Sequence, residues 1–146
     1  MNTSLSKPFR VLIADDDNDD IQLTKDWFNE NRLPIHVNDV GDGQVLMDHL
    51  KGMTVSKSRD LPQLIILDIN MPRKSGFEAL QELKEDHHLR KIPVVIFSTS
   101  YTTQDVERAY ELGASCFVSK PNSFEEWCDK IGKLGRFWIE CVRVSS

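Results

Sequence analysis

Short apolar runs alternate along the chain with longer stretches in which apolar residues recur at helical spacing. The runs predict five strands, over residues 10–14, 35–40, 64–67, 93–97 and 115–118. Four of these runs are continuously apolar, as expected for parallel strands that helices cover on both faces. The stretches between and after them predict five helices. This alternation is typical of an α/β protein with a doubly wound parallel sheet.

The length of 146 residues fits a single domain. At this size the common form of a doubly wound sheet of five strands is the flavodoxin-like one. We predict that the domain covers residues 9–139, with an N-terminal tail at 1–8 and a C-terminal tail at 140–146. The polar segment 51–63, between the second helix and the third strand, is predicted to be a long, flexible loop.

Charge and hydropathy exclude several classes of protein. The 18 basic and 23 acidic residues give a net charge of -5, which argues against binding nucleic acid or anionic lipid. No uninterrupted apolar run exceeds four residues, whereas a membrane span needs roughly 20. The N-terminus lacks the features of a signal peptide, and the three cysteines show no CxxC spacing. We therefore expect a cytoplasmic protein with no nucleic-acid partner and no membrane contact.

Polar residues follow four of the predicted strands where each strand ends. They are Asp15-Asp16-Asp17, Asp68-Ile69-Asn70, Ser98-Thr99-Ser100 and Ser119-Lys120-Pro121. In open α/β sheets ligands bind at the carboxyl ends of the strands, so these residues are predicted to share one site. Crowded carboxylates repel each other unless a cation lies among them. Mg²⁺ fits this sparse set better than Ca²⁺, because it needs only one or two carboxylates beside water and phosphate oxygens.

The same residues suit phosphoryl transfer. Asp68 is a candidate nucleophile that would form an acyl phosphate, while Lys120 and Ser98 are candidate donors to the phosphoryl oxygens. Taken singly, Ser98 fits an ordinary loop hydroxyl and Lys120 a solvated lysine. The segment 17–19 fits helix capping better than chemistry. The prediction therefore rests on the joint placement of these residues at the strand ends.

Four segments resemble the signature segments of the receiver domain of two-component response regulators. They are VLIADDDNDD, LIILDINMPRKSG, IPVVIFSTS and GASCFVSKP. The resemblance extends over about residues 9 to 139. Ser98 follows Asp68 by 30 residues and Lys120 follows Ser98 by 22, which are the spacings of that family.

The resemblance implies a role for each residue of the predicted site. Asp68 would accept a phosphoryl group from a phosphohistidine of a sensor kinase or phosphotransfer protein. Asp16, Asp68 and the backbone carbonyl of Asn70 would hold Mg²⁺, with Asp15 assisting through water. The chain would thus be a phosphoprotein and not an enzyme, apart from self-catalysed phosphotransfer and dephosphorylation at Asp68.

Three further features are implied by the resemblance. Ser98 would carry the switching hydroxyl, and Phe117 would be the switching aromatic residue. Lys120 would pair with the phosphate, and the Lys120–Pro121 peptide bond would be cis, as is usual in the family. Phosphorylation would then rearrange the surface of the domain.

The end of the chain suggests how this signal leaves the domain. Only six residues follow Glu140, so we expect no effector domain and an output through the receiver surface itself. The long loop before the third strand and the ending FWIECV resemble single-domain response regulators that partner phytochrome-type sensor kinases. The last predicted helix is more apolar than one packed face requires, which favours a homodimer through the fourth helix, fifth strand and fifth helix. The alternative is that its apolar stripe belongs wholly to the core.

Two other functions compete with a phosphorylated receiver. A haloacid-dehalogenase-like phosphatase also uses a nucleophilic Asp, magnesium, a hydroxyl and a lysine. That family needs a second carboxylate two residues after the nucleophile to move a proton, and this chain has Asn70 there. A pseudo-receiver that acts as an unphosphorylated scaffold would usually have lost part of the site, whereas this sequence keeps all of it.

Overall fold

One parallel sheet of five strands forms the centre of the molecule. The computed structural model describes residues 8–142 and 144. The strands are β1 (Phe9–Ala14), β2 (Ile35–Val40), β3 (Leu64–Leu67), β4 (Val94–Ser98) and β5 (Cys116–Ser119). All neighbouring strands are parallel, in the order β2-β1-β3-β4-β5. This is the flavodoxin-like order, so the predicted fold class is confirmed.

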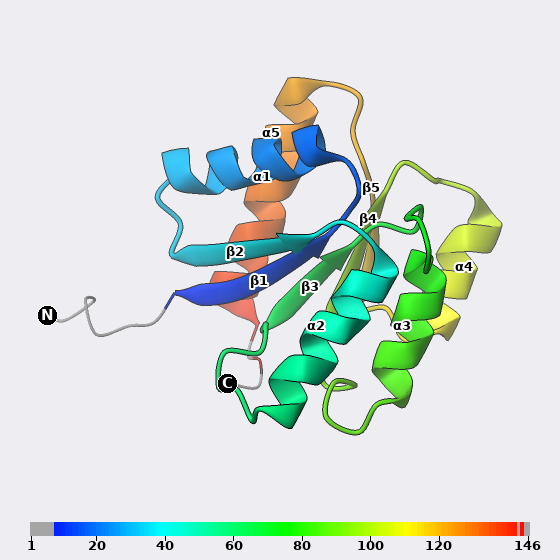
Figure 1. Ribbon diagram of the computed structural model, residues 1–146. Coiled ribbons are helices and arrows are strands. Elements are labelled where there is room, and N and C mark those ends of the chain that lie inside the picture. Colours follow the sequence, from blue (N-terminus) through cyan, green and yellow to red (C-terminus); the bar gives the residue numbers. More distant parts are fainter. Residues whose placement is uncertain (1–7, 143, 145–146) are drawn as a thin grey trace, which may run out of the picture.

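Helices cover both faces of this sheet (Figure 1). They are α1 (Asn18–Glu30), α2 (Gly43–Val55), α3 (Gly76–Glu85), α4 (Thr103–Glu111) and α5 (Phe124–Arg136), which the short π-helix η2 (Phe137–Cys141) continues. Helices α1 and α5 pack together on one face, and α2, α3 and α4 lie on the other. Each face therefore has its own apolar core.

The position of each strand in the sheet explains its sequence pattern. Every residue of β3 and β4 is buried, because both strands have neighbours on either side and helices above and below. Strand β2 forms an edge, and its burial alternates along IHVNDV, with His36 and Asn38 exposed. Apolar runs thus mark the inner strands and alternation marks the β2 edge, whereas β5 at the other edge is half-buried throughout.

A polar side chain caps the start of each α-helix. The caps are Asp17, Asp42, Ser75, Thr102 and Ser123, and each accepts a hydrogen bond from a backbone N–H in the first turn. Asp17 accepts from the N–H groups of Asp19 and Asp20, which agrees with the expected capping role of this segment. Four of these caps lie within four residues of the end of the preceding strand, and Ser75 lies eight residues after β3.

The structure differs from the sequence predictions at several boundaries. Helix α2 continues to Val55, so the connection predicted over 51–63 begins only at Ser56. Gly52 interrupts the apolar pattern but does not end the helix, because a single glycine costs a helix only about 1 kcal/mol. Strands β4 and β5 begin and end one residue later than predicted.

The peptide bond between Lys120 and Pro121 is trans, since the described residues include no cis peptide bond. The expectation of a cis bond was therefore wrong for this structure. The bond before a proline favours trans by only about 0.5 to 1 kcal/mol, so the local sequence does not determine the isomer.

The C-terminal helix continues beyond the predicted domain boundary, since η2 ends at Cys141. Helix α5 packs closely on α1, and a Cβ atom added at Gly132 would lie 2.8 Å from the Trp27 ring. No helix in the described part of the chain has the length and apolar character needed to cross a membrane.

Candidate functional site

The predicted site residues meet at the carboxyl end of the sheet. Asp15 follows β1, Asp68 follows β3, Ser98 is the last residue of β4, and Lys120 follows β5. Backbone hydrogen bonds fix the positions of these residues relative to one another along the strands. The Asp68 N–H donates to the Ala14 carbonyl at 2.9 Å, and the Lys120 N–H donates to the Ser98 carbonyl at 2.7 Å. Parallel pairing therefore brings together residues that lie far apart in the sequence.

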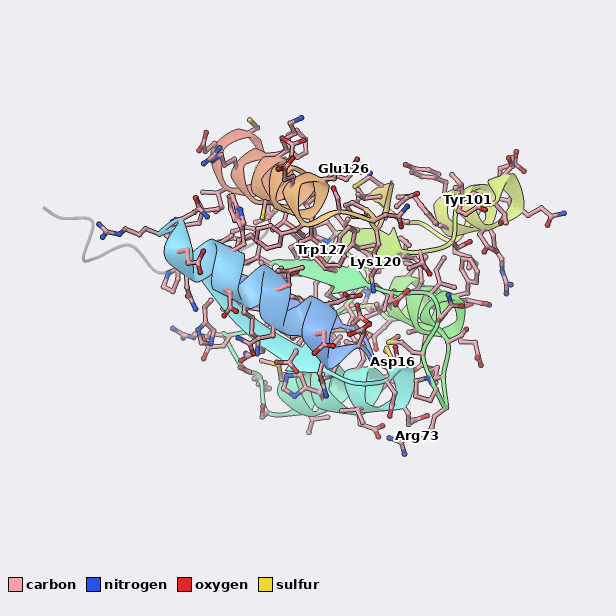
Figure 2. All side chains as sticks on the ribbon, turned by 90° about the horizontal axis from the view of Figure 1, so that it is seen from above. Asp16, Arg73, Tyr101, Lys120, Glu126 and Trp127 are labelled. Atoms are coloured by element: carbon pink, nitrogen blue, oxygen red, sulfur yellow. The ribbon has the colours of Figure 1, made fainter. Side chains whose placement is uncertain are left out.

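The Lys120 side chain is almost fully buried at this end, with 4% of it exposed. Its Nζ donates to Asp15 Oδ2 at 2.7 Å, to Asp20 Oδ2 at 2.8 Å and to Asp68 Oδ2 at 3.1 Å. An ammonium group has three N–H bonds, so all three have a carboxylate partner. In Figure 2, Lys120 lies well inside the molecule, whereas Arg73 points outward at the rim.

The charged groups shift each other's proton affinity. Burial raises the pKa of Asp15 to about 6, although the hydrogen bonds from Lys120 and from the Asp17 N–H act in the opposite direction. Burial alone would lower the pKa of Lys120, but its hydrogen bonds to Asp15 and Asp20 outweigh this and raise it. Lys120 therefore stays charged, while Asp15 carries a carboxylate that burial disfavours.

Three carboxylates at this end lie close enough to share a cation. Asp15, Asp16 and Asp68 each offer an oxygen, and these oxygens lie within 4.8 Å of one another. Asp15 and Asp68 are buried, whereas Asp16 is exposed. Oxygen ligands of this kind suit a hard divalent cation, and its charge would offset both the burial and the mutual repulsion of the carboxylates. The residues present therefore fit the predicted metal site.

The segment after Asp68 packs directly against the backbone of Asp68. A Cβ atom added at Gly76, the first residue of α3, would lie 2.2 Å from the Asp68 carbonyl oxygen. The Asn70 N–H lies 3.4 Å from Asp68 Oδ1, and the Asn70 side chain is exposed. The close approach at Gly76 leaves room only for glycine and holds the start of α3 beside the site.

The two predicted switch residues lie on adjacent strands. Ser98 is completely buried, and its Oγ accepts from the Ser100 N–H at 3.4 Å. Phe117 is half-buried on β5, next to Ile96 of β4. Its N–H donates to the Tyr110 hydroxyl of α4 at 3.1 Å. Phe117 is thus tied to α4 and not to the carboxylates.

Asp20 is a residue of this site that the sequence pattern does not predict. It lies in the first turn of α1, with its carboxylate 2.8 Å from the Lys120 amine. The position of Asp20 in the sequence does point to the site, since α1 begins shortly after β1 and its first turn therefore lies over the carboxyl end of the sheet. An acid in the first turn also fits the helix dipole, so the sequence alone did not distinguish the two roles.

Comparisons with known proteins agree with this geometry. A family model described as the response regulator receiver domain matches residues 11–132. Response regulator Rcp1 of Synechocystis sp. is 29% identical over 144 residues, which cover 99% of this chain and 98% of Rcp1. The crystal structure of the phosphorylated cyanobacterial phytochrome response regulator RcpA has a TM-score of 0.88 at 29% identity, and the match covers 95% of this chain and 99% of RcpA. The Mn²⁺-bound form of Rcp1 has a TM-score of 0.86 at 29% identity, covering 95% of this chain and 100% of Rcp1.

The chain belongs to the response regulator receiver domain family. Within that family it is similar along nearly its whole length to response regulator Rcp1 and to the cyanobacterial phytochrome response regulator RcpA. The resemblance stated from the sequence is confirmed, and membership of this family replaces the phosphatase alternative. Receiver domains act with proteins that donate a phosphoryl group, such as sensor kinases, and bind a divalent cation at their acidic site.

Proposed function

We propose that this protein accepts a phosphoryl group on Asp68 from a phosphohistidine of a sensor kinase or phosphotransfer protein. One observation supports this choice over Asp15, the other buried carboxylate that contacts Lys120. Asp15 has both oxygens engaged in short bonds, to Lys120 at 2.7 Å and to the Asp17 N–H at 3.0 Å. Asp68 has only the longer contacts of 3.1 Å and 3.4 Å. Of these two buried carboxylates, Asp68 is therefore the one whose oxygens are held less tightly and can attack.

The transfer is a displacement at the phosphorus atom. An oxygen of Asp68 forms a bond to phosphorus while the bond from phosphorus to the donor's imidazole nitrogen breaks. The electron pair of the broken bond stays on that nitrogen, which then takes up a proton. Lys120 lies where its charge would offset the negative charge of the phosphoryl oxygens. The same arrangement would serve self-catalysed phosphotransfer and hydrolysis, with no other enzyme activity.

Mg²⁺ is the divalent cation that we expect to assist this reaction. Asp16, Asp68 and the backbone carbonyl of Asn70 would hold it, with Asp15 assisting through water. Bound there, it would neutralise charge on the phosphoryl oxygens and lower the repulsion between the carboxylates.

A mass-spectrometric experiment with acetyl phosphate and MgCl₂ tests the acceptor. The wild-type protein is expected to gain one phosphoryl group, and Asp68→Asn is expected to gain none. An Asp15→Asn variant serves as a matched control, since it also removes one buried carboxylate at the Lys120 amine. Stoichiometric phosphorylation of Asp68→Asn would contradict the assignment.

The metal ligands have a separate test in the tryptophan fluorescence of the protein, to which Trp127 contributes. This ring packs edge to face on Phe97, with 5.1 Å between centroids, and the Lys120 Nζ lies 6.0 Å from the Phe97 ring. Asp16→Asn is expected to weaken Mg²⁺ binding by about tenfold or more, because it removes a direct carboxylate ligand. Asp17→Asn removes the same charge and keeps a capping side chain on α1. Equal losses in both variants would contradict the choice of Asp16.

Phosphorylation is expected to act on the surface through Ser98 and Phe117. A phosphoryl group adds a charge of about -1.5 to -2 beside the Ser98 hydroxyl, which would then turn towards it and free space for Phe117. The Phe117 N–H bond to Tyr110 gives this movement a direct connection to α4. Lys120→Ala is expected to accept phosphate but to transmit the signal poorly. A partner response equal to that of the wild type would count against the switch.

We further propose a homodimer through α4, β5 and α5. Phe124 and Phe137 are exposed on α5 and at the start of η2. An open hollow of about 450 Å³ is lined by Phe137 together with Val118, Lys130, Lys133 and Leu134. Trp127, Ile131 and Trp138 are buried in the core and Leu134 packs against it, as the alternative expected, so the dimer proposal depends on the exposed Phe124 and Phe137. Sedimentation at micromolar concentration, with and without acetyl phosphate, tests the dimer, and monomers under both conditions would contradict it.

The similarity to phytochrome response regulators suggests the source of the signal. We expect a phytochrome-like photoreceptor kinase to be the donor, with phosphotransfer that depends on red or far-red illumination. Transfer from a purified kinase of this class under both light conditions tests the link. A cytoplasmic location and the lack of a nucleic-acid partner stay predictions from the sequence.

A further inference from the structure

Three carboxylates contact the Lys120 amine, and they are not equivalent. The bonds to Asp15 and Asp20 are the shorter ones, at 2.7 Å and 2.8 Å, and the bond to Asp68 is 3.1 Å. Asp15 and Asp20 both lie at the start of α1 or just before it, whereas Asp68 lies after β3. Two of the three N–H bonds of the amine therefore anchor it to the β1–α1 connection, and the third is directed at the proposed acceptor.

The three carboxylates also differ in what else they serve. Asp15 and Asp68 belong to the group of carboxylates that could hold a cation, together with Asp16. Among the described residues, Asp20 is outside that group. A cation and a phosphoryl group at this site would compete with Lys120 for Asp15 and Asp68. Of the three carboxylates, Asp20 would then be the one whose negative charge interacts with Lys120 and not with the cation or the phosphoryl group.

The local structure of α1 explains how Asp20 reaches this position. Asp17 caps the helix and accepts from the N–H groups of both Asp19 and Asp20, which fixes the first turn. A glutamate at this third helical position commonly turns back to bond the capping residue's N–H. The shorter side chain of Asp20 bonds the Lys120 amine instead. The side chain of Asp20 is 24% exposed, against 4% for that of Lys120.

We propose that Asp20 is a positioning residue for Lys120. It is the counter-ion that keeps the amine beside Asp68 when the cation and the phosphoryl group occupy Asp15 and Asp68. This inference rests on the proposed function, because it concerns phosphorylation of Asp68. It adds a residue that acts through the lysine and touches neither the cation nor the phosphoryl group.

Asp19 provides a matched control within the same turn. It is also acidic and exposed, and the described residues give its carboxylate no hydrogen-bond partner. Both carboxylates interact favourably with the helix dipole. Replacing either one therefore removes the same stabilising charge from the first turn of α1. Only Asp20→Ala removes a contact to Lys120. A difference between the two variants therefore reports the loss of the Lys120 contact and not the loss of an acidic charge at the start of the helix.

The first test measures the rate of phosphorylation by acetyl phosphate with Mg²⁺ at saturating concentration. Asp20→Ala is expected to lower the rate constant by about tenfold, the equivalent of one charge-assisted hydrogen bond. Asp20→Asn, which keeps an acceptor without charge, is expected to fall between Asp20→Ala and the wild type. Asp19→Ala is expected to change the rate by less than about twofold.

A double-mutant cycle shows whether Asp20 acts through Lys120. In a Lys120→Met background, Asp20→Ala is expected to lower the rate by less than about twofold, because the amine that it positions is gone. An equal loss in both backgrounds would overturn the inference, since Asp20 would then act through its field or through the helix.

The second test is independent of activity. The ¹⁵Nζ resonance of Lys120 is expected to be observable by NMR in the wild type, because a buried amine with three carboxylate partners exchanges its protons slowly. Asp20→Ala is expected to shift or broaden this resonance both with and without Mg²⁺, and Asp19→Ala is expected to leave it in place. Unchanged resonance and rate in Asp20→Ala would overturn the role of Asp20 alone. A wild-type protein that takes up no phosphoryl group would instead overturn the proposed function.

Discussion

Two regions of the molecule are built in opposite ways. At the carboxyl end of the sheet the side chains of Lys120, Asp15 and Asp68 are charged yet at least nine-tenths buried, and they bond one another. On the surface formed by α4, β5 and α5, Phe124 and Phe137 are apolar yet 66% and 53% exposed. Each region departs from the ordinary rule for its residue types.

The difference separates rigidity from adaptability. Buried charges need partners at fixed distances, so the backbone around them has to be tightly packed. Exposed apolar side chains cost little stability, and they can change partners without disturbing the core. We therefore expect the site to be intolerant of small changes in shape and the surface to be tolerant of large ones.

Crowding the site should give the largest effect. Gly76→Ala places a Cβ atom 2.2 Å from the Asp68 carbonyl oxygen, so the backbone has to move. We expect this variant to lose about 3 kcal/mol of unfolding free energy in urea titrations. Gly52→Ala is the control, because nothing lies within 4 Å of its added Cβ on α2, and it should gain about 0.5 to 1 kcal/mol. A Gly76→Ala protein as stable as the wild type would contradict the tight packing of the site.

The buried charge of Asp15 should give the next effect, measured in metal-free buffer. Burial raises the pKa of Asp15 from 3.8 to about 6 in the folded protein. Folding therefore favours the protonated acid, and the stability that this contributes is lost as the pH rises through the folded pKa. Relative to Asp15→Asn, the wild type should lose about 2 kcal/mol of unfolding free energy between pH 4 and pH 7. Parallel curves for the two proteins would mean that the charge is not destabilising.

Changes at the exposed surface should have the smallest effect on stability. Phe137→Ser should change the unfolding free energy of the monomer by less than about 0.5 kcal/mol, since the side chain is already largely in water. The same variant should shift the sedimentation equilibrium towards monomers. Val55→Ser, which removes an exposed apolar side chain at the end of α2, outside the proposed interface, is the control and should leave association unchanged. A large loss of stability in Phe137→Ser would place this residue in the core.

The sequence predicted the fold well because the inner strands are marked by continuous burial, which only apolar residues satisfy. It also predicted the residues that meet at the strand ends, since the carboxyl ends of parallel strands lie at one edge. Contacts from outside the strand ends were harder to predict. Asp20 contacts Lys120 from the first turn of α1. Arg73, whose φ is 64°, lies between β3 and α3 and forms an ion pair with Asp42, the cap of α2. Such contacts depend on where a helix or loop lies in space, which no local pattern records.

The amine of Lys120 joins parts of the chain that are made at very different times. It lies 105 residues beyond Asp15 and 52 residues beyond Asp68 in the sequence. During synthesis Asp68 is therefore present long before Lys120, and β5 has to join the sheet before the two side chains can meet. Closing contacts over such separations is slow and comes late in folding. A nascent or truncated chain that lacks β5 would hold Asp68 without its lysine, so only a completely folded protein would be competent to receive a signal.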